Sequence, residues 1–97
     1  MTIEKIQNGA ELNIKVIGRL DTITAPQLEA EFKDLTGATK LVLDFENLEY
    51  ISSAGLRVIL GAQKTMNKQG EMIIKNVNET INEIFEVTGF IDILTIE

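Results

Sequence analysis

The chain of 97 residues contains no histidine, no cysteine and no tryptophan. Without histidine and cysteine it cannot form a Ser-His-Asp triad, a cysteine nucleophile or a zinc site made of His and Cys ligands. The phosphate-binding motifs GxxxxGK[ST] and GxGxxG are also missing. No nucleophile is left with an adjacent base, so we expect no enzyme activity, no cofactor and no metal site.

Basic residues are scarce too. Nine lysines and arginines stand against fifteen aspartates and glutamates, which gives a formal net charge of −6. A nucleic-acid-binding protein needs a concentrated basic face, so we expect no nucleic-acid partner. No apolar run approaches the roughly 20 residues of a spanning helix, and MTIEKIQNG lacks the apolar core of a signal peptide. We therefore expect a cytoplasmic protein without a membrane partner, a compartment that the absence of cysteine fits.

The length is sufficient for one small domain with a single core. The composition, 44% hydrophobic and 25% charged, is typical of a globular protein. No repeat, linker or low-complexity segment divides the chain. We expect a single domain over residues 1–97, present as a monomer.

The first half of the chain predicts a hairpin followed by a helix. Asn8-Gly9 between two strand-like segments indicates a hairpin within residues 2–17, and Gly18 is expected to end its second strand. A helix should then start at Thr24, with Gln27 completing a capping-box pattern, and Gly37 should close it. The residues expected on its buried face are Ala25, Leu28, Phe32 and Leu35.

The second half predicts strands alternating with helices. An apolar strand is expected from Thr39 to Phe45, and a short turn leads from it into a helix over about 54–69. Gly61 inside that helix costs about 1 kcal/mol relative to alanine, so we expect close backbone packing or a partner there.

A strand at 71–75 and a third helix should follow. Asn76 with Glu79 forms the capping pattern of that helix, Gly89 should close it, and a last strand is expected at 93–96. The element order predicts an α/β fold with a mixed, largely parallel sheet of about five strands and three main helices.

The segment LEYISSAGLRVIL, residues 48–60, places two adjacent serines before a strongly apolar helix. Serine is a preferred N-cap, because its hydroxyl accepts a hydrogen bond from a free amide of the first turn. That end of a helix also has about half a positive charge and suits an anion. A hydroxyl there can be a cap, a phosphate acceptor or both, and the residue pattern leaves these alternatives open.

The stretches GRLDTITAPQL, LVLDFENLEYISSAGLRVILGA, GEMIIKNV and FEVTGFIDIL together resemble a STAS domain of the stand-alone anti-sigma-factor antagonist family. The resemblance covers essentially the whole chain and implies the STAS fold. In that family a serine of the central turn is phosphorylated by the anti-sigma factor, which is itself a serine kinase. Only the unphosphorylated antagonist binds the kinase and frees the sigma factor. The resemblance thus implies two partners, this kinase and a serine phosphatase that resets the switch.

Mapped onto the family motif, the phosphorylated serine is Ser53. The family usually has aspartate where this chain has Ser52, and serine or threonine where it has Ala54. For Ser53 the alternative is a pure N-cap. Ser52 is expected to be the cap or a supporting hydroxyl beside Ser53, with modification of Ser52 as the alternative.

The family places the GRLDT loop beside the phosphorylated turn, so Asp21 and Thr22 are expected to contact the partner. The alternative for Asp21 is a turn-forming role. Arg57, one turn into the helix, is expected to be exposed and either to touch the partner or to be a solvated charge. The predicted partner-binding residues are Asp21, Thr22, Ser52, Ala54 and Arg57.

Two other functions are alternatives to an anti-sigma factor antagonist. Asp44 ends a central strand, as the phosphoacceptor aspartate of a two-component receiver does, but the acidic pair and the lysine that receivers need are missing. The second rival is a STAS module in a partner-switching pathway without a sigma factor. It would use the same surface, so the sequence does not separate it from an antagonist.

Overall fold

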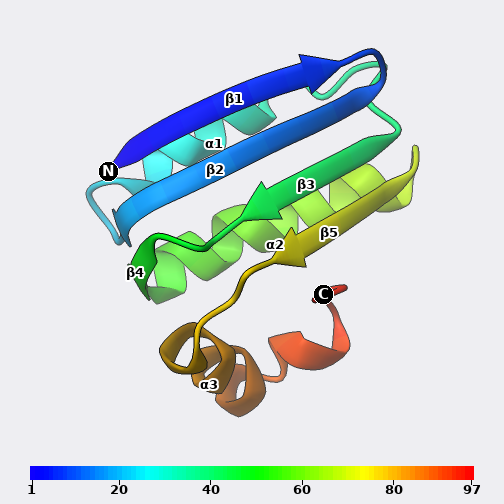
Figure 1. Cartoon of the computed structure of the whole chain (residues 1–97). Coiled ribbons are helices and arrows are strands. Elements are labelled where there is room, and N and C mark those ends of the chain that lie inside the picture. The colour runs from blue at the N-terminus through cyan, green and yellow to red at the C-terminus, as the bar shows by residue number, and fades with distance from the viewer.

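The sheet is organised around β2 (Glu11–Leu20), as the computed structural model of residues 1–97 shows (Figure 1). β1 (Thr2–Asn8) pairs antiparallel with one edge of β2. β3 (Lys40–Asp44) and then β4 (Leu48–Ile51) pair parallel with it, and β5 (Glu71–Lys75) pairs parallel with β3. The expected α/β fold with a mixed, largely parallel sheet is confirmed.

The helices leave one face of the sheet open. α1 (Ala25–Phe32) and α2 (Ser53–Asn67) lie behind the same face in Figure 1, whereas α3 (Glu79–Thr88) lies beyond β5. A short 3-10 turn, η1 (Phe90–Asp92), follows α3. None of the helices is long and apolar enough to cross a bilayer.

One hydrophobic core joins the sheet to all three helices. Leu12, Ile14 and Val16 of β2 point into it, in the alternation that the sequence shows. Ile59 of α2 and Phe85 of α3 are completely buried in the same cluster. Since every helix packs against this core, the sheet sets where each helix lies.

Two predictions about the strands were wrong, the end of β2 and the turn that follows β3. β2 does not end at Gly18, because the strand shifts register there through a bulge and continues to Leu20. The Gly18 N–H donates to the Asn47 carbonyl at 2.9 Å, and Gly18 has a φ of +103°. The segment expected to be a turn is strand β4, which pairs with this continued part of β2.

The predicted capping box of α1 was also wrong. The Thr24 hydroxyl accepts from the Asp21 N–H at 2.8 Å and donates to the Arg19 carbonyl at 2.7 Å, so it does not cap the helix. α1 ends at Phe32 rather than Gly37. Leu35 is still buried, but it reaches the core from the loop.

The third helix begins two residues later than expected. Its cap is Asn78, whose Oδ1 accepts from the Ile81 N–H at 2.9 Å. Asn76 instead adopts a φ of +60° and donates its side-chain amide to Asp44 at 3.0 Å. Gly89 closes the helix in the left-handed conformation, as expected. The strand predicted at 93–96 is only a bridge from Ile96 to Ile74, because η1 takes up the preceding residues.

Candidate functional site

The loop after β2 and the start of α2 lie side by side. β2 and β4 are parallel neighbours, and Leu20 stands opposite Ile51 where both strands end. The Ser52 N–H donates to the Leu20 carbonyl at 2.8 Å, which joins the two segments. The carboxyl ends of parallel strands meet at one edge of a sheet, so the residues that follow them share one surface.

Ser52 and Ser53 have different roles. Ser52 is extended and half-buried, and its Oγ accepts from the Gly55 N–H at 3.3 Å, so it is the N-cap of α2 as expected. Ser53 is the first helical residue and is exposed, and its hydroxyl makes no hydrogen bond within the chain. The alternative in which Ser53 is the cap was therefore wrong. The Ser53 hydroxyl is accessible for reaction or for contact with a partner.

Gly55 sets the position of this helix start. A Cβ there would lie 2.7 Å from Leu20 Cγ, which is closer than packed atoms approach, and at a tight 3.0 Å from Ile51 Cγ1. A larger residue would push the first turn of α2 away from the ends of β2 and β4. The glycine of the SSAGL motif thus fixes how far Ser53 stands from the loop beside it.

The α2 N-terminus has no acidic side chain in its first turn. The partial positive charge of the helix end is therefore not compensated by a carboxylate of that turn. Such a helix start favours an added negative charge at its first residue, which is Ser53.

Asp21 holds the neighbouring loop in shape. Its Oδ1 accepts from the N–H groups of Ile23 and Thr24, both at 3.0 Å. The Thr24 N–H has the largest effect and lowers the pKa of Asp21; partial desolvation opposes it, and the Ile23 N–H, the Thr24 hydroxyl and Arg19 lower the pKa further. This carboxylate performs the turn-forming role that was its alternative, and the loop presents Thr22 and Ile23 to solvent.

A groove of about 220 Å³ joins several predicted partner-binding residues. Thr22 lines it from the loop, and Ala54 and Arg57 line it from α2. Asp21 and Ser52 do not line it; their hydrogen bonds hold the two backbone segments that do. The structure therefore separates the five predicted residues into three at the groove surface and two that support it. The rest of the lining is Ala25, Pro26, Glu29 and Val58.

Sequence reasoning missed three residues around this site. Ile23 is 86% exposed in the loop. The only sign of it in the sequence was an isoleucine among the polar residues of DTIT. The Arg19 guanidinium lies 4.5 Å from the centre of the Tyr50 ring, and its Nε lies 4.0 Å from Asp21 Oδ2. The Arg19–Tyr50 pair depends on the pairing of β2 with β4, which the sequence did not reveal.

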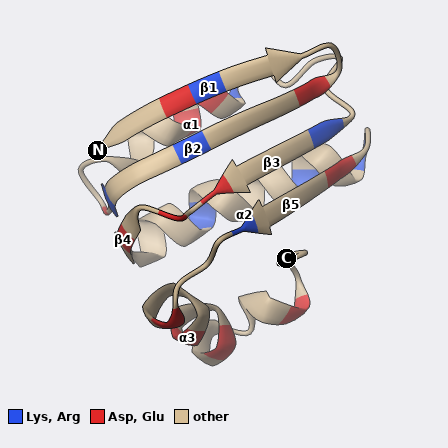
Figure 2. Ribbon diagram, viewed as in Figure 1, with Lys and Arg blue, Asp and Glu red and all other residues tan.

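Charge is divided unevenly among the helices (Figure 2). α2 and the residues that close it, 53–69, contain three basic residues and no acidic one. α3 contains Glu79, Glu83 and Glu86 and no basic residue. Ser53 therefore lies at the start of the basic helix, α2.

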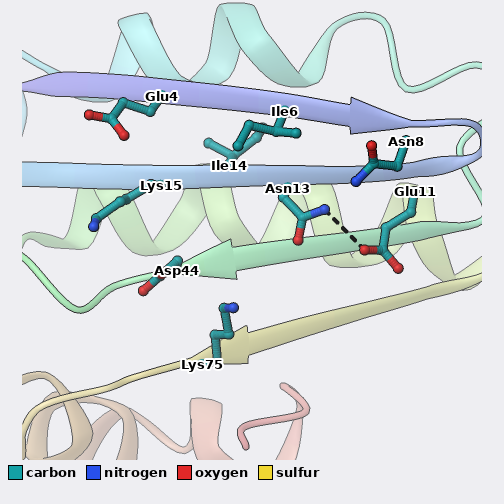
Figure 3. A pocket seen from close by; sticks show the side chains of 9 residues that line it. All are labelled: Glu4, Ile6, Asn8, Glu11, Asn13, Ile14, Lys15, Asp44 and Lys75. Atoms are coloured by element: carbon teal, nitrogen blue, oxygen red, sulfur yellow. Dashed lines mark hydrogen bonds between the residues drawn. The ribbon is translucent and has the colours of Figure 1, made fainter.

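The open face of the sheet has a separate hollow of about 400 Å³ (Figure 3). Asp44 lines it beside Lys15 and Lys75, with polar groups from β1 and β2 around them. Burial acts to raise the pKa of Asp44, but hydrogen bonds from Asn76 and the Glu46 N–H, with the two lysines, outweigh it and lower the pKa. Asp44 thus ties β3 to the segment after β5. The structure contains no group of three or more acidic side chains placed to hold a metal ion.

The sequence matches the family model of the STAS domain over residues 2–97. The anti-sigma-B factor antagonist of Staphylococcus aureus is 31% identical over 97 residues, which cover 97% of this chain and 90% of that protein. BtrV of Bordetella bronchiseptica, provisionally named as an anti-sigma factor antagonist, is 39% identical over 82 residues, 81% of this chain and 71% of BtrV.

Solved structures show the same fold. A provisionally named anti-sigma factor antagonist from Thermotoga maritima has a TM-score of 0.88 at 19% identity, covering 97% of this chain and 84% of that one. SpoIIAA in its unphosphorylated form has a TM-score of 0.78 at 19% identity, covering 99% and 87% of the two chains. The phosphorylated form of SpoIIAA, a Bacillus cell fate determinant, has a TM-score of 0.77 at 22% identity, covering 99% and 91%.

The chain belongs to the STAS domain family. The two relatives described above are both named anti-sigma factor antagonists.

Proposed function

We propose that this protein is an anti-sigma factor antagonist whose binding is controlled by phosphorylation of Ser53. The unphosphorylated chain binds an anti-sigma factor that is a serine kinase, and this binding frees the sigma factor. Phosphorylation by that kinase ends the binding, and a serine phosphatase restores it. We expect this exchange in the cytoplasm, with the chain as a monomer.

The observation that supports this proposal best is the state of Ser53. It is exposed, it is free of internal hydrogen bonds, and it starts a helix that its neighbour Ser52 already caps. Phosphorylation therefore removes no contact that the fold needs. The relatives named anti-sigma factor antagonists, and the SpoIIAA fold solved in both phosphorylation states, support the same proposal.

A phosphate at this position changes binding without a change of fold. Phosphoserine has a charge of about −1.5 to −2, which a helix N-terminus tolerates in the free protein. In an interface shaped for a bare hydroxyl, the same group is too large and poorly solvated. A loss of about 3 kcal/mol of binding free energy weakens a complex more than a hundredfold.

The predicted partner-binding residues form two groups in the structure. We propose that Thr22, Ala54 and Arg57, which line one groove, contact the partner directly. Asp21 and Ser52 contribute indirectly, because they hold the loop and the helix start in position.

Phosphate mapping tests the proposal. The wild-type chain is incubated with the anti-sigma factor kinase encoded in the same genome and Mg-ATP, and the product is digested and examined by mass spectrometry. We expect one phosphate on Ser53 of the wild type, none on Ser53→Ala, and a phosphate still on residue 53 of Ser52→Ala. A phosphate on Ser52, or none on the wild type, contradicts the proposal.

The sigma-factor part of the proposal needs its own measurement. Unphosphorylated protein is added to a preformed complex of the kinase with its sigma factor, and free sigma factor is measured. Release is the expected result. Binding of the kinase without release favours the partner-switching module that controls a different output.

A further inference from the structure

The exposed side of α2 continues well beyond Ser53. Residues four apart in a helix lie on one face, so Ser53, Arg57 and Gly61 form a row, and all three are exposed. The row continues through exposed polar residues to the end of the helix. We call the whole set the α2 stripe: Ser53, Arg57, Gly61, Lys64, Thr65 and Lys68.

A trough runs beside this stripe, between α1 and α2. A second groove, of about 230 Å³, is lined by Phe32 and Lys33 on the α1 side and by Gly61 and Thr65 on the α2 side. It shares Glu29, Arg57 and Val58 with the groove at the Ser53 turn. The two grooves therefore adjoin and together form one trough, which begins at Thr22 and Ala54, the latter next to Ser53 in the chain, and follows α2.

No contact within the chain requires a glycine at position 61. A Cβ at Gly61 would meet nothing within 4 Å, whereas one at Gly55 or Gly70 would collide with Leu20 or with the Thr39 backbone. Close internal packing, one of the two explanations expected from the sequence, is thus excluded. Glycine is unfavourable inside a helix, so its presence on an open surface points to something outside the chain that approaches the backbone.

The charge of the stripe indicates the chemistry of that partner. Arg57 and Lys33 line the trough together with one carboxylate, Glu29, and Lys64 and Lys68 add two cations on the exposed side of α2. Arg57, Lys64 and Lys68 are three of the nine basic residues, and residues 53–69 contain no acidic residue, in a chain of net charge −6. No ion pair within the chain uses any of these three side chains. An acidic segment is the partner surface that complements such a stripe.

We propose that the α2 stripe and its trough are a second part of the docking surface, occupied by an acidic segment of the same kinase that reads Ser53. The segment passes closest to α2 over Gly61. The inference rests on the proposed function, because it takes the occupant to be that kinase. It adds a contact some distance from Ser53 that anchors the kinase, while the state of Ser53 decides whether the complex forms.

Substitution of Gly61 tests this directly, with the purified kinase as the probe. Gly61→Gln places a helix-favouring side chain in the trough, so we expect a melting temperature higher by about 5 °C and an affinity at least tenfold lower. Gly61→Ala should shift both quantities in the same directions, with a smaller loss of affinity. Opposite changes in stability and binding exclude misfolding as the cause.

Charge reversal tests the acidic occupant. Lys64→Glu should weaken binding at least fivefold and reduce the salt dependence that we expect of the wild type. Lys75→Glu makes the same change of charge on the open face of the sheet and should stay within twofold of the wild type. Affinities measured by calorimetry at 50 and 300 mM NaCl provide both quantities.

The outcomes separate the two proposals. If Gly61→Gln and Lys64→Glu bind within twofold of the wild type while Ser53→Asp does not bind, the stripe is not part of the interface and the Ser53 switch stands. If Ser53→Asp binds normally while the stripe variants are weakened, the proposed switch is wrong and the docking surface stands. A wild-type chain that does not bind the kinase overturns both.

Discussion

α2 and α3 begin in the same way locally, but their starts are used differently. Each follows an extended residue whose side-chain oxygen accepts from an N–H three residues on, Ser52 for α2 and Asn78 for α3. In α3 the cap also donates its amide to the Leu48 carbonyl at 2.8 Å, and Glu79 supplies a negative charge in the first turn. In α2 the cap bond is longer, at 3.3 Å, and the first turn has no acid.

The same contrast extends along both helices. α3 is acidic on its exposed side, and its core side is fixed by Ile81 and Phe85, both completely buried. α2 is basic on its exposed side, with Ser53 and Gly61 both open to solvent. A helix start that is internally satisfied serves the fold, whereas one with an unused hydroxyl and an uncompensated end is available to a partner.

Adding a negative charge to each helix start should show the largest difference. Ser53→Asp is expected to weaken binding to the kinase at least a hundredfold, about 2.7 kcal/mol, while the melting temperature stays nearly unchanged. Thr80→Asp adds the same charge in the first turn of α3 and should leave binding within twofold. Binding affinity and thermal unfolding of both variants provide the test. Equal binding losses for the two variants would mean that overall charge, not the α2 start, controls the complex.

Removing each N-cap should lower the free energy of unfolding by an intermediate amount. The loss should be larger for α3 than for α2. Asn78→Ala loses two hydrogen bonds, to Ile81 and to Leu48, so we expect a loss of about 2 kcal/mol in the free energy of unfolding. Ser52→Ala loses one long bond and should cost about 0.5–1 kcal/mol. Urea unfolding at pH 7 measures both values. A greater loss for Ser52→Ala would reverse the contrast between the helices.

Acid should loosen the loop beside α2 and the segment before α3, with the smallest effect on stability. Asp21 holds the loop beside α2, and Asp44 holds the segment that leads into α3 through Asn76. Folding lowers the pKa of both carboxylates, so their contribution is complete above the unfolded pKa of about 4 and disappears as the pH falls through the lower folded values.

Unfolding by urea between pH 6 and 2.5 measures that contribution. Asp21→Asn and Asp44→Asn should each reduce the fall in stability below pH 4 relative to the wild type. An unchanged pH dependence in Asp44→Asn would show that its hydrogen bonds to Asn76 and Glu46 do not favour the charged form.

Most of the fold followed from the local pattern, and the errors share one cause. The hairpin at Asn8-Gly9, the alternation in β2 and the αL closure at Gly89 are local features, and all were confirmed. β4 was missed because four residues pair only with the continued end of β2, a contact distant in sequence. Thr24 holds the N-cap position of α1 as expected, but its side chain bonds to Arg19 instead of capping the helix. The cap of α3 was misplaced because the Asn76 side chain bonds to Asp44.

The sequence by itself determined the α/β class, the position of the helix that begins at the SSAGL turn, and Ser53 as the candidate for modification. The fold class and the helix follow from periodicity and from residue types that act within one turn of chain, whereas Ser53 was selected over Ser52 by the resemblance to the STAS family. Tertiary structure alone decided that Ser52 caps while Ser53 is free, and that Gly61 faces open space. It also decided that Thr22 and Arg57 share a groove. The physical reason is that exposure and proximity depend on how β2, β4, α1 and α2 pack together, which no local pattern specifies.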